Sequence, residues 1–246
     1  MNKIFLKPDE TVDELLYGEL KIIQKKRGWR YSVDALLLAD FVLETIQPKD
    51  KILDLGCGAG VISLILARRS SARKIIGVEI QKALAGRAQR NVRLNHLEKK
   101  ITILHRDARK LPQFFPQKSF DLIVSNPPFR KVGSGYLSPE KERAIARYEL
   151  KLKMPQLIQL AEYLLKPNGR LALVYPIERL KELLAELEKS HLKPSRLRFA
   201  YHKKGEPRPV LFCLEARRKS PGLLLQPPWY IETEKGRFHL DRDKHS

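Results

Sequence analysis

Short apolar runs alternate with longer segments of helical period from residue 51 onward, and this alternation is the strongest constraint on the fold. Strands that are separated by helix-length segments are joined by crossover connections, so the pattern predicts βαβ units and a parallel sheet. Five runs are predicted as the parallel strands: Lys51–Leu55, Lys74–Glu79, Ile101–His105, Phe120–Ser125 and residues 170–175.

Helical periodicity and turn residues complete the predicted α/β architecture. After the fifth parallel strand, two further strands joined by a Lys-Gly-Glu-Pro turn predict an antiparallel pair at the edge of the sheet. The expected fold is therefore a seven-stranded, mostly parallel sheet with an antiparallel C-terminal edge and helices on both faces. The predicted helices cover residues 61–69, 81–96, 140–165 and 178–190, and the antiparallel strands cover 195–202 and 209–216.

Two segments flank this body, and residues 1–246 are predicted to form one decorated domain. The N-terminal extension, about residues 1–48, holds short β-like pieces within 15–31 and then an apolar helix over 33–45 that begins after Ser32. The C-terminal segment, about residues 220–240, contains two consecutive prolines and a Glu-Lys-Gly turn signal. We expect this segment to form a small hairpin on the surface.

The formal net charge of +20 limits the classes of partner. Residues 51–125 carry 15 basic and five acidic side chains, so the excess belongs to the folded body and not to a tail. A strongly basic globular protein favours a polyanionic partner, with nucleic acid first and an anionic membrane second. Adaptation to a hot environment is the alternative explanation of the lysine and arginine content.

Cysteine usage and hydropathy exclude several other classes. The two cysteines, Cys57 and Cys213, have no histidine or cysteine at ligand spacing, so neither a disulfide framework nor a zinc site is predicted. Apolar runs are far shorter than the roughly 20 residues of a spanning helix, and the N-terminus lacks a signal-peptide pattern. We therefore expect a cytoplasmic protein that requires no metal.

A glycine-rich turn, Asp54-Leu55-Gly56-Cys57-Gly58-Ala59-Gly60, lies between the first predicted parallel strand and the helix that follows it. Glycines there let the backbone turn sharply and approach a ligand closely, and the spacing differs from the dinucleotide-binding fingerprint. A carboxylate at Asp54 would favour a cationic ligand group and repel a pyrophosphate.

Acidic residues also end the next two strands. Glu79 stands 25 residues beyond Asp54, a position from which a carboxylate can bind both hydroxyls of an adenosine ribose. Asp107, in Arg106-Asp107-Ala108, follows the third strand, where it can accept a hydrogen bond from an adenine amino group. Since the carboxyl ends of parallel strands meet at one edge, these groups are predicted to line a common crevice.

The fourth strand is followed by Ser125-Asn126-Pro127-Pro128-Phe129. An exocyclic amine on an aromatic ring is a poor nucleophile, because its lone pair is delocalised into the ring. The Asn126 side-chain oxygen and the Pro127 carbonyl can accept both amine hydrogens, which draws the nitrogen toward sp³ geometry. The prolines would hold these acceptors rigid, and Phe129 offers a face on which a planar base can stack.

These motifs, in this order and spacing, resemble those of the class I S-adenosylmethionine-dependent methyltransferases, which have a Rossmann-like fold. The stretch from Gln24 to Leu38 is similar to the corresponding stretch of bacterial tRNA adenine-N6 methyltransferases that modify the purine 3′ of the anticodon of a valine tRNA. The resemblance covers about residues 10 to 240. It implies Asn126, Pro127, Pro128 and Phe129 as catalytic residues. It also implies S-adenosylmethionine as the cofactor, held by Arg30, Tyr31, Ser32, Asp34, Asp54, Gly56, Cys57, Gly58, Gly60, Glu79, Ile80, Asp107, Ala108 and Asn126.

An RNA substrate, with tRNA as the first candidate, agrees with both the resemblance and the charge, although +20 also leaves a broader or different RNA target open. DNA adenine-N6 methylation, protein-glutamine N-methylation and a non-catalytic RNA-binding module are the alternatives. The sequence does not decide between a monomer and a homodimer. The candidate RNA-binding residues are Lys25, Lys26, Arg27, Arg130, Lys131, Lys203 and Lys204.

Overall fold

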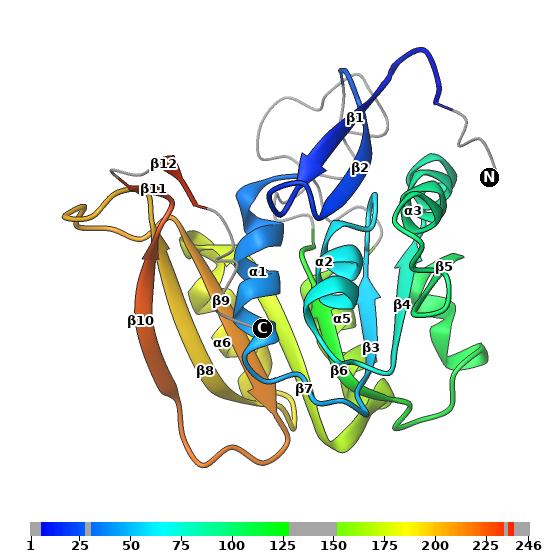
Figure 1. Ribbon diagram of the computed structural model, residues 1–246. Helices are drawn as coiled ribbons and strands as arrows, with labels where there is room; N and C mark the ends of the chain where they lie inside the picture. The colour runs from blue at the N-terminus through cyan, green and yellow to red at the C-terminus, as the bar shows by residue number, and fades with distance from the viewer. Residues whose placement is uncertain (1–5, 28–30, 128–151, 234–235, 239–246) are drawn as a thin grey trace.

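A computed structural model describes residues 6–27, 31–127, 152–233 and 236–238 (Figure 1). Its elements in chain order are β1 (Glu10–Leu15), β2 (Leu20–Lys25), α1 (Val33–Leu43), β3 (Lys51–Leu55), α2 (Val61–Arg69), β4 (Lys74–Glu79), α3 (Lys82–Leu94), β5 (Ile101–His105), η1 (Ala108–Gln113), β6 (Phe120–Ser125), α5 (Met154–Leu164), β7 (Leu165–Pro176), η2 (Ile177–Arg179), α6 (Leu180–Glu188), β8 (Lys193–Tyr201), β9 (Leu211–Arg217), β10 (Leu224–Tyr230), β11 (Glu232–Thr233) and β12 (Gly236–Arg237).

The main sheet has the order β10-β8-β9-β7-β6-β3-β4-β5. β9 is antiparallel to both of its neighbours, and the other pairings are parallel. The predicted α/β class with a mostly parallel sheet and an antiparallel pair near the C-terminus is therefore confirmed. The predicted count of seven strands was wrong, because β10 adds an eighth strand at the edge beside β8.

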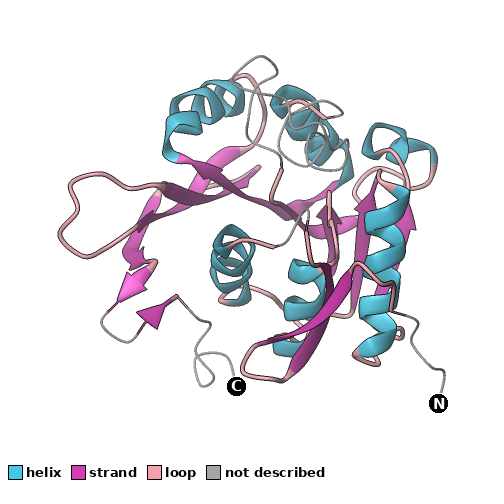
Figure 2. Cartoon of the chain, turned by 90° about the horizontal axis from the view of Figure 1, so that it is seen from above, coloured by secondary structure: helices cyan, strands magenta, loops and turns pink. Residues whose placement is uncertain are grey.

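Helices cover both faces of the sheet, as predicted (Figure 2). Helices α1, α2 and α3 pack on one face and share a core with Ile52, whereas α5 and α6 pack on the other face and share a core with Leu53. Consecutive strand residues point to opposite faces, so β3 must be apolar on both sides. No helix within the described ranges is long and apolar enough to cross a membrane.

Strand β7 begins earlier than predicted. The sequence predicts a helix to residue 165 and a strand from 170, and α5 does end at Leu164, but the chain then continues directly as β7 from Leu165. The pairing with β6 jumps from Phe120 opposite Leu165 to Leu122 opposite Arg170, so these residues form an irregularity within the strand.

The C-terminal segment differs from the predicted surface hairpin. Residues of β10 pair with β8, and only the short strands β11 and β12 form a hairpin. The proline pair Pro227-Pro228 indicated a break, but an edge strand tolerates prolines, and the register shifts between Gln226 and Trp229. The buried Trp229 donates a hydrogen bond from Nε1 to Asp40 Oδ2 at 3.0 Å, which attaches this segment to α1.

An N-terminal hairpin, β1–β2, lies across the helices on the α3 side (Figure 1). Two asparagines one helical turn apart on α3 hydrogen bond to the backbone of β2. Asn91 accepts from the Ile23 amide at 2.6 Å and donates to the Ile23 carbonyl at 3.2 Å. Asn95 makes the same pair of bonds with Lys21, at 2.8 and 2.7 Å. The side chains thus satisfy backbone groups that the strand edge would otherwise leave unpaired.

Candidate active site

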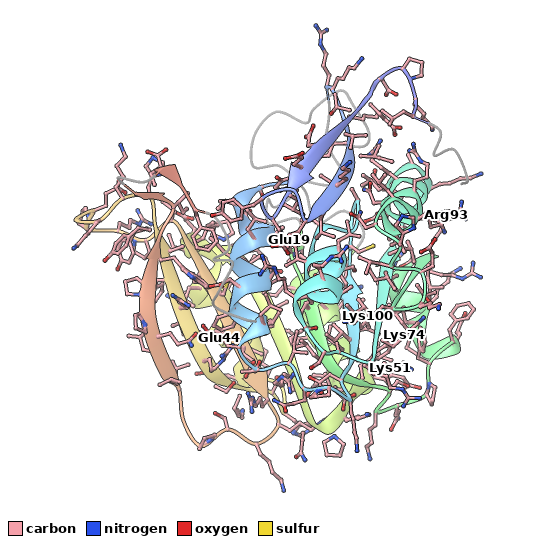
Figure 3. The ribbon with its side chains drawn as sticks, in the orientation of Figure 1. Glu19, Glu44, Lys51, Lys74, Arg93 and Lys100 are labelled. Carbon is pink, nitrogen blue, oxygen red and sulfur yellow. The ribbon has the colours of Figure 1, made fainter. Side chains whose placement is uncertain are left out.

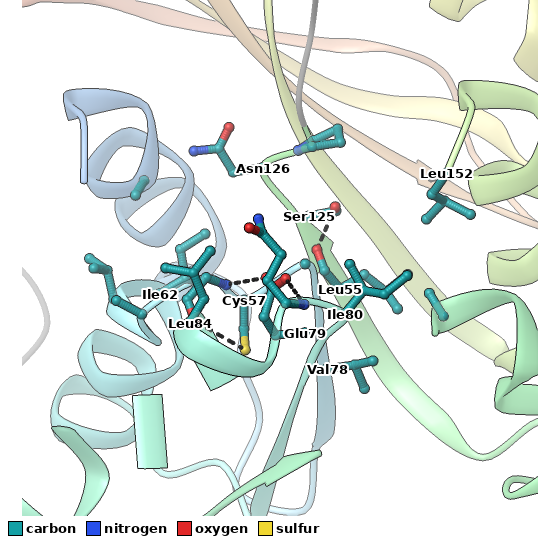
Figure 4. Close-up of a pocket in the computed structure, with 18 of the residues that line it drawn as sticks. Leu55, Cys57, Ile62, Val78, Glu79, Ile80, Leu84, Ser125, Asn126 and Leu152 are labelled. Carbon is teal, nitrogen blue, oxygen red and sulfur yellow. Dashed lines mark hydrogen bonds between the residues drawn. The ribbon is translucent and has the colours of Figure 1, made fainter. Parts of the chain in front are cut away.

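A pocket lies at the carboxyl ends of β3, β4, β5 and β6, where the crevice was predicted (Figure 4). Segments far apart in the sequence contribute its walls: the start of α1, the glycine turn, and the residues that follow β4, β5 and β6. The predicted site residues that line it are Tyr31, Ser32, Gly56, Cys57, Gly58, Glu79, Ile80, Asp107, Ala108, Asn126 and Pro127.

The glycine turn presents its backbone to this pocket. Gly56 and Gly58 have φ values of +71° and +57°, which side-chain-bearing residues rarely adopt. A Cβ placed on either residue would meet no atom within 4 Å, so both positions face open space. The amide of Gly56 donates to the Val78 carbonyl at 2.8 Å, which holds the turn against β4. A ligand can therefore approach the backbone of this turn closely.

Glu79 is 5% exposed and organises the floor of the pocket (Figure 4). One carboxylate oxygen accepts from the Gly58 amide at 3.0 Å, and the other accepts from the Gln81 amide at 2.8 Å. Burial raises the pKa of Glu79, while these backbone hydrogen bonds lower it. Because each carboxylate oxygen has a second lone pair, the group can still accept hydrogen bonds from ligand hydroxyls.

Asp107 has a different environment at the next strand end. Its carboxylate pairs with the exposed Arg109, with 2.5 Å between Oδ2 and the guanidinium, and accepts from the Arg109 amide at 3.0 Å. The Arg109 hydrogen bond is the main reason why the pKa of Asp107 is lowered. The side chain is therefore an ionised acceptor at the pocket wall.

Asn126 and Pro127 follow β6 and line the same pocket. The preceding residue, Ser125, donates from Oγ to the Leu55 carbonyl at 2.8 Å, which fixes the end of β6 beside β3 (Figure 4). Among the residues that the structure describes, none hydrogen bonds to the Asn126 side chain, so its amide oxygen and nitrogen are available to a ligand. Pro128 and Phe129 lie outside the described residues.

Three predicted cofactor residues do not line the pocket. Asp54 shares its strand face with Ile52, so it points toward α2, where Oδ2 accepts from the Ser63 hydroxyl at 2.6 Å and from the Ser63 amide at 3.2 Å. Gly60 is the N-cap of α2 and has a φ of +88°; its Cβ position lies 3.3 Å from Ala88. Asp34 is buried within α1. These three residues lie outside the lining of the pocket, and their contact with a cofactor stays a prediction.

Burial raises the pKa of Asp54 to about 7, far above its ordinary value of 3.8. Its Oδ1 atom has no hydrogen-bond partner within the described part of the chain.

The pKa of Asp54 is higher in the folded state than in the unfolded state. The free energy of unfolding therefore falls as pH rises from about 4 to about 7, by up to about 4 kcal/mol. In Asp54→Asn, we expect this contribution to vanish. Urea unfolding at pH 5 and pH 8 should show a smaller difference between the two pH values than in the wild type; an unchanged difference would contradict the assignment.

The candidate RNA-binding residues are only partly described. Lys25, Lys26 and Arg27 follow the pocket residue Gln24; the Lys25 ammonium is 3.9 Å from Asp9, and Lys26 donates to the Pro8 carbonyl. Lys203 and Lys204 follow β8, whose carboxyl end lies at the same edge of the sheet as the pocket, and Lys203 is 3.4 Å from Glu232. Arg30, Arg130 and Lys131 lie outside the described residues.

Sequence reasoning missed several pocket residues, of which Gln24 is the most informative. Gln24 is 3% exposed on β2; its Oε1 accepts from the Tyr31 amide at 3.0 Å, and its Nε2 donates to Asp13 at 2.7 Å. The hairpin thereby positions the residues before α1 at the pocket. A polar residue within the apolar pattern of β2 was the available signal. The other missed residues include Ile62, Gln81, Leu84, Arg106, Ser125 and Leu152.

Comparisons with known proteins agree with this geometry. Residues 46–211 match the family model of a methyltransferase domain. The tRNA1(Val) (adenine(37)-N6)-methyltransferase of Porphyromonas gingivalis is 35% identical over 189 residues, 75% of this chain and 73% of that protein. The enzyme of the same name from Dyadobacter fermentans is 26% identical and covers 92% of each chain. A predicted O-methyltransferase from Agrobacterium tumefaciens has a similar fold, with a TM-score of 0.63, 20% identity and coverage of 84% of this chain and 91% of that one.

Proposed function

The chain belongs to the family of tRNA1(Val) (adenine(37)-N6)-methyltransferases, and we propose that it methylates N6 of an adenine next to the anticodon of a tRNA, with S-adenosylmethionine as the methyl donor. One observation carries this proposal. Asn126 and Pro127 line the same pocket as the glycine turn and two acidic strand ends. Acceptors suited to an aromatic amine thus lie beside a site suited to a cationic adenosine derivative.

The residues of the pocket fit S-adenosylmethionine. Gly56 and Gly58 leave open space where a side chain would otherwise project. Glu79 would accept hydrogen bonds from the ribose hydroxyls, and Asp107 from the adenine amino group. These acidic residues favour a ligand with net positive charge and would repel a pyrophosphate. When bound, the cofactor supplies a methyl group that its sulfonium has already activated.

Asn126 and Pro127 would orient the amine that accepts the methyl group. The Asn126 oxygen and the Pro127 carbonyl would accept the two N6 hydrogens and turn the nitrogen lone pair out of the plane of the ring. Pro127 restricts the backbone, and the Ser125–Leu55 hydrogen bond holds the preceding residue, so the acceptors are preorganised. The amine proton leaves to solvent after transfer. The target adenine has to be turned out of its stack to enter the pocket.

A transfer assay tests this function. Purified protein with isotopically labelled S-adenosylmethionine should methylate total tRNA, and nucleoside mass spectrometry should identify the product as N6-methyladenosine. DNA and a release-factor protein serve as the competing substrates, since both offer a planar nitrogen acceptor. Label that appears only in DNA or only in protein would contradict the proposal, and no transfer to any of the three would favour a non-catalytic RNA-binding role.

A further inference from the structure

Six cations gather at the amino ends of the parallel strands, at the edge of the sheet opposite the pocket. We call Lys49, Lys51, Arg73, Lys74, Lys99 and Lys118 the amino-edge patch. Lys51 and Lys74 are direct neighbours in the pairing of β3 with β4, and Lys74 Nζ donates to the Lys99 carbonyl at 3.2 Å. Figure 3 shows Lys51 and Lys74 close together on this side of the molecule, with Lys100 beside them.

Two acids at this edge of the sheet, Asp50 and Asp121, form ion pairs with cations outside the patch. Asp50 is 2.6 Å from the Arg170 guanidinium, and Asp121 is 2.8 Å from the Lys166 ammonium. Lys100 is not counted in the patch. Its ammonium donates to two carbonyls at the C-terminal end of α2, a position that favours a cation. Within the described ranges, no acidic side chain forms an ion pair with any of the six patch residues.

The cations of the amino-edge patch repel one another in the unbound protein. Like charges on directly opposed strand positions destabilise a sheet. Burial lowers the pKa of Lys51, and the nearby cations Lys166 and Arg73 lower it further, while the Asp121 carboxylate raises it. A bound polyanion would relieve this repulsion, and five of the fifteen basic residues of 51–125 belong to the patch that can attract one.

A line of cations connects the pocket to the patch along the β5 edge of the sheet. Between His105 and Phe120 the chain carries Arg106, Arg109, Lys110 and Lys118 but one acid, Asp107. Arg106 lines the pocket, and its guanidinium lies 4.9 Å from the ring centroid of Phe114, which is 51% exposed. A five-residue strand spans about 17 Å, so the pocket and the patch lie about that distance apart. A helical stem of a bound RNA can span this distance.

We propose that the amino-edge patch binds the phosphate backbone of the stem that carries the target adenine. The choice of RNA as the partner rests on the proposed function. The patch contacts phosphates and not bases, so it contributes affinity without sequence preference. Its binding energy is the same before and during methyl transfer, so it lowers KM and leaves kcat unchanged.

Charge reversal at three exposed patch residues tests this. The variant Arg73→Glu, Lys99→Glu, Lys118→Glu is compared with the control Lys181→Glu, Lys193→Glu, Lys219→Glu. The control residues are also exposed, but they lie on α6, at the start of β8 and after β9, at the far end of the strand order from the patch, with β7 and β6 between them and β3. Both variants lower the net charge equally. For full-length tRNA, we expect KM to rise at least tenfold in the patch variant and less than threefold in the control. The kcat of both should stay within twofold of the wild type.

Two further measurements locate the contact. An anticodon loop that is closed by only one or two base pairs has a stem much shorter than about 17 Å and does not reach the patch, so its KM should be the same in both variants. The slope of log Kd for tRNA against log salt should decrease by about 2 in the patch variant, as expected for about three lost phosphate contacts. Far-ultraviolet circular dichroism and urea unfolding establish that both variants are folded.

Several results would overturn the proposal: an unchanged KM for tRNA, an equal effect of the control, or an equal loss with the short stem-loop. Loss of binding to anionic phosphatidylserine vesicles, with binding to tRNA intact, would assign the patch to a membrane instead. Direct tRNA binding is measured alongside turnover, so absence of methyl transfer in the wild type would refute the proposed function while the patch is still tested.

Discussion

Asn126→Ala should remove most methyl transfer and leave cofactor binding nearly unchanged. The side chain lines the pocket, but no described residue hydrogen bonds to it, so its loss leaves no protein group unpaired. What is lost is one of the two acceptors that orient the amine. Removal of one preorganised polar group at a reacting centre commonly costs about 10²–10³-fold in kcat. Single-turnover kinetics and calorimetric titration with S-adenosylhomocysteine measure the two quantities separately.

Glu79→Gln is the reciprocal control for this prediction. Glu79 holds the glycine turn through the Gly58 amide and would bind the ribose, so its neutral variant should weaken cofactor affinity at least tenfold. The effect on kcat at saturating cofactor should be much smaller. If Asn126→Ala weakened cofactor binding as strongly as Glu79→Gln does, or kept full turnover, the assignment of Asn126 to the amine would be wrong.

The central strands could be predicted from the sequence because both faces of each are buried. The bounds predicted for these strands, β3, β4 and β6, agree with the structure, and so do those of the edge strand β5. Apolar runs of this kind mark parallel strands directly. The strands at the two ends of the chain could not be predicted as well. β10 carries a proline pair that indicates a turn, and β1 alternates the exposed Val12 and Glu14 with the half-buried Thr11 and Asp13, so neither has a clear apolar run.

Most of the candidate site could be predicted, because the topology brings consecutive strand ends to one edge. The direction of individual side chains could not. Asp54 belongs to the glycine motif. Because successive side chains of β3 point to opposite faces of the sheet, the Asp54 side chain points toward Ser63 and away from the pocket. Gln24 contributes through hydrogen bonds to Asp13 and Tyr31, which are 11 and 7 residues away in the sequence, and no periodic pattern specifies these partners. The net charge predicted a polyanionic partner but not where the cations lie, and five of the fifteen basic residues of 51–125 lie at the edge of the sheet opposite the pocket.

The second large effect is expected at Glu10, which attaches the N-terminal hairpin to α3. This carboxylate is 4% exposed and bridges two guanidinium groups, with 2.6 Å to Arg90 and 3.2 Å to the buried Arg87. The hydrogen bond with Arg90 is the largest contribution that lowers the pKa of Glu10 from 4.5 to about 2. Because the folded-state pKa is the lower one, this stabilisation is complete above about pH 4.5 and is lost as pH falls toward 2. The shift corresponds to about 3 kcal/mol.

Glu10→Gln should remove this pH dependence of stability. It should also weaken the contact between the N-terminal hairpin and α3, even at pH 7. The variant removes the negative charge that faces the buried Arg87, and removal of one member of a buried ion pair costs about 3–5 kcal/mol. Hydrogen exchange should therefore accelerate at the amides of β1 and β2. Since Gln24 on β2 holds Tyr31 at the pocket, cofactor affinity should fall as well.

Glu19→Gln is the matched control on the same hairpin. Its pair with Arg69 is more exposed, so its loss should cost less than about 1 kcal/mol. Unchanged exchange in Glu10→Gln would show that Asn91 and Asn95 hold the hairpin without the ion pair.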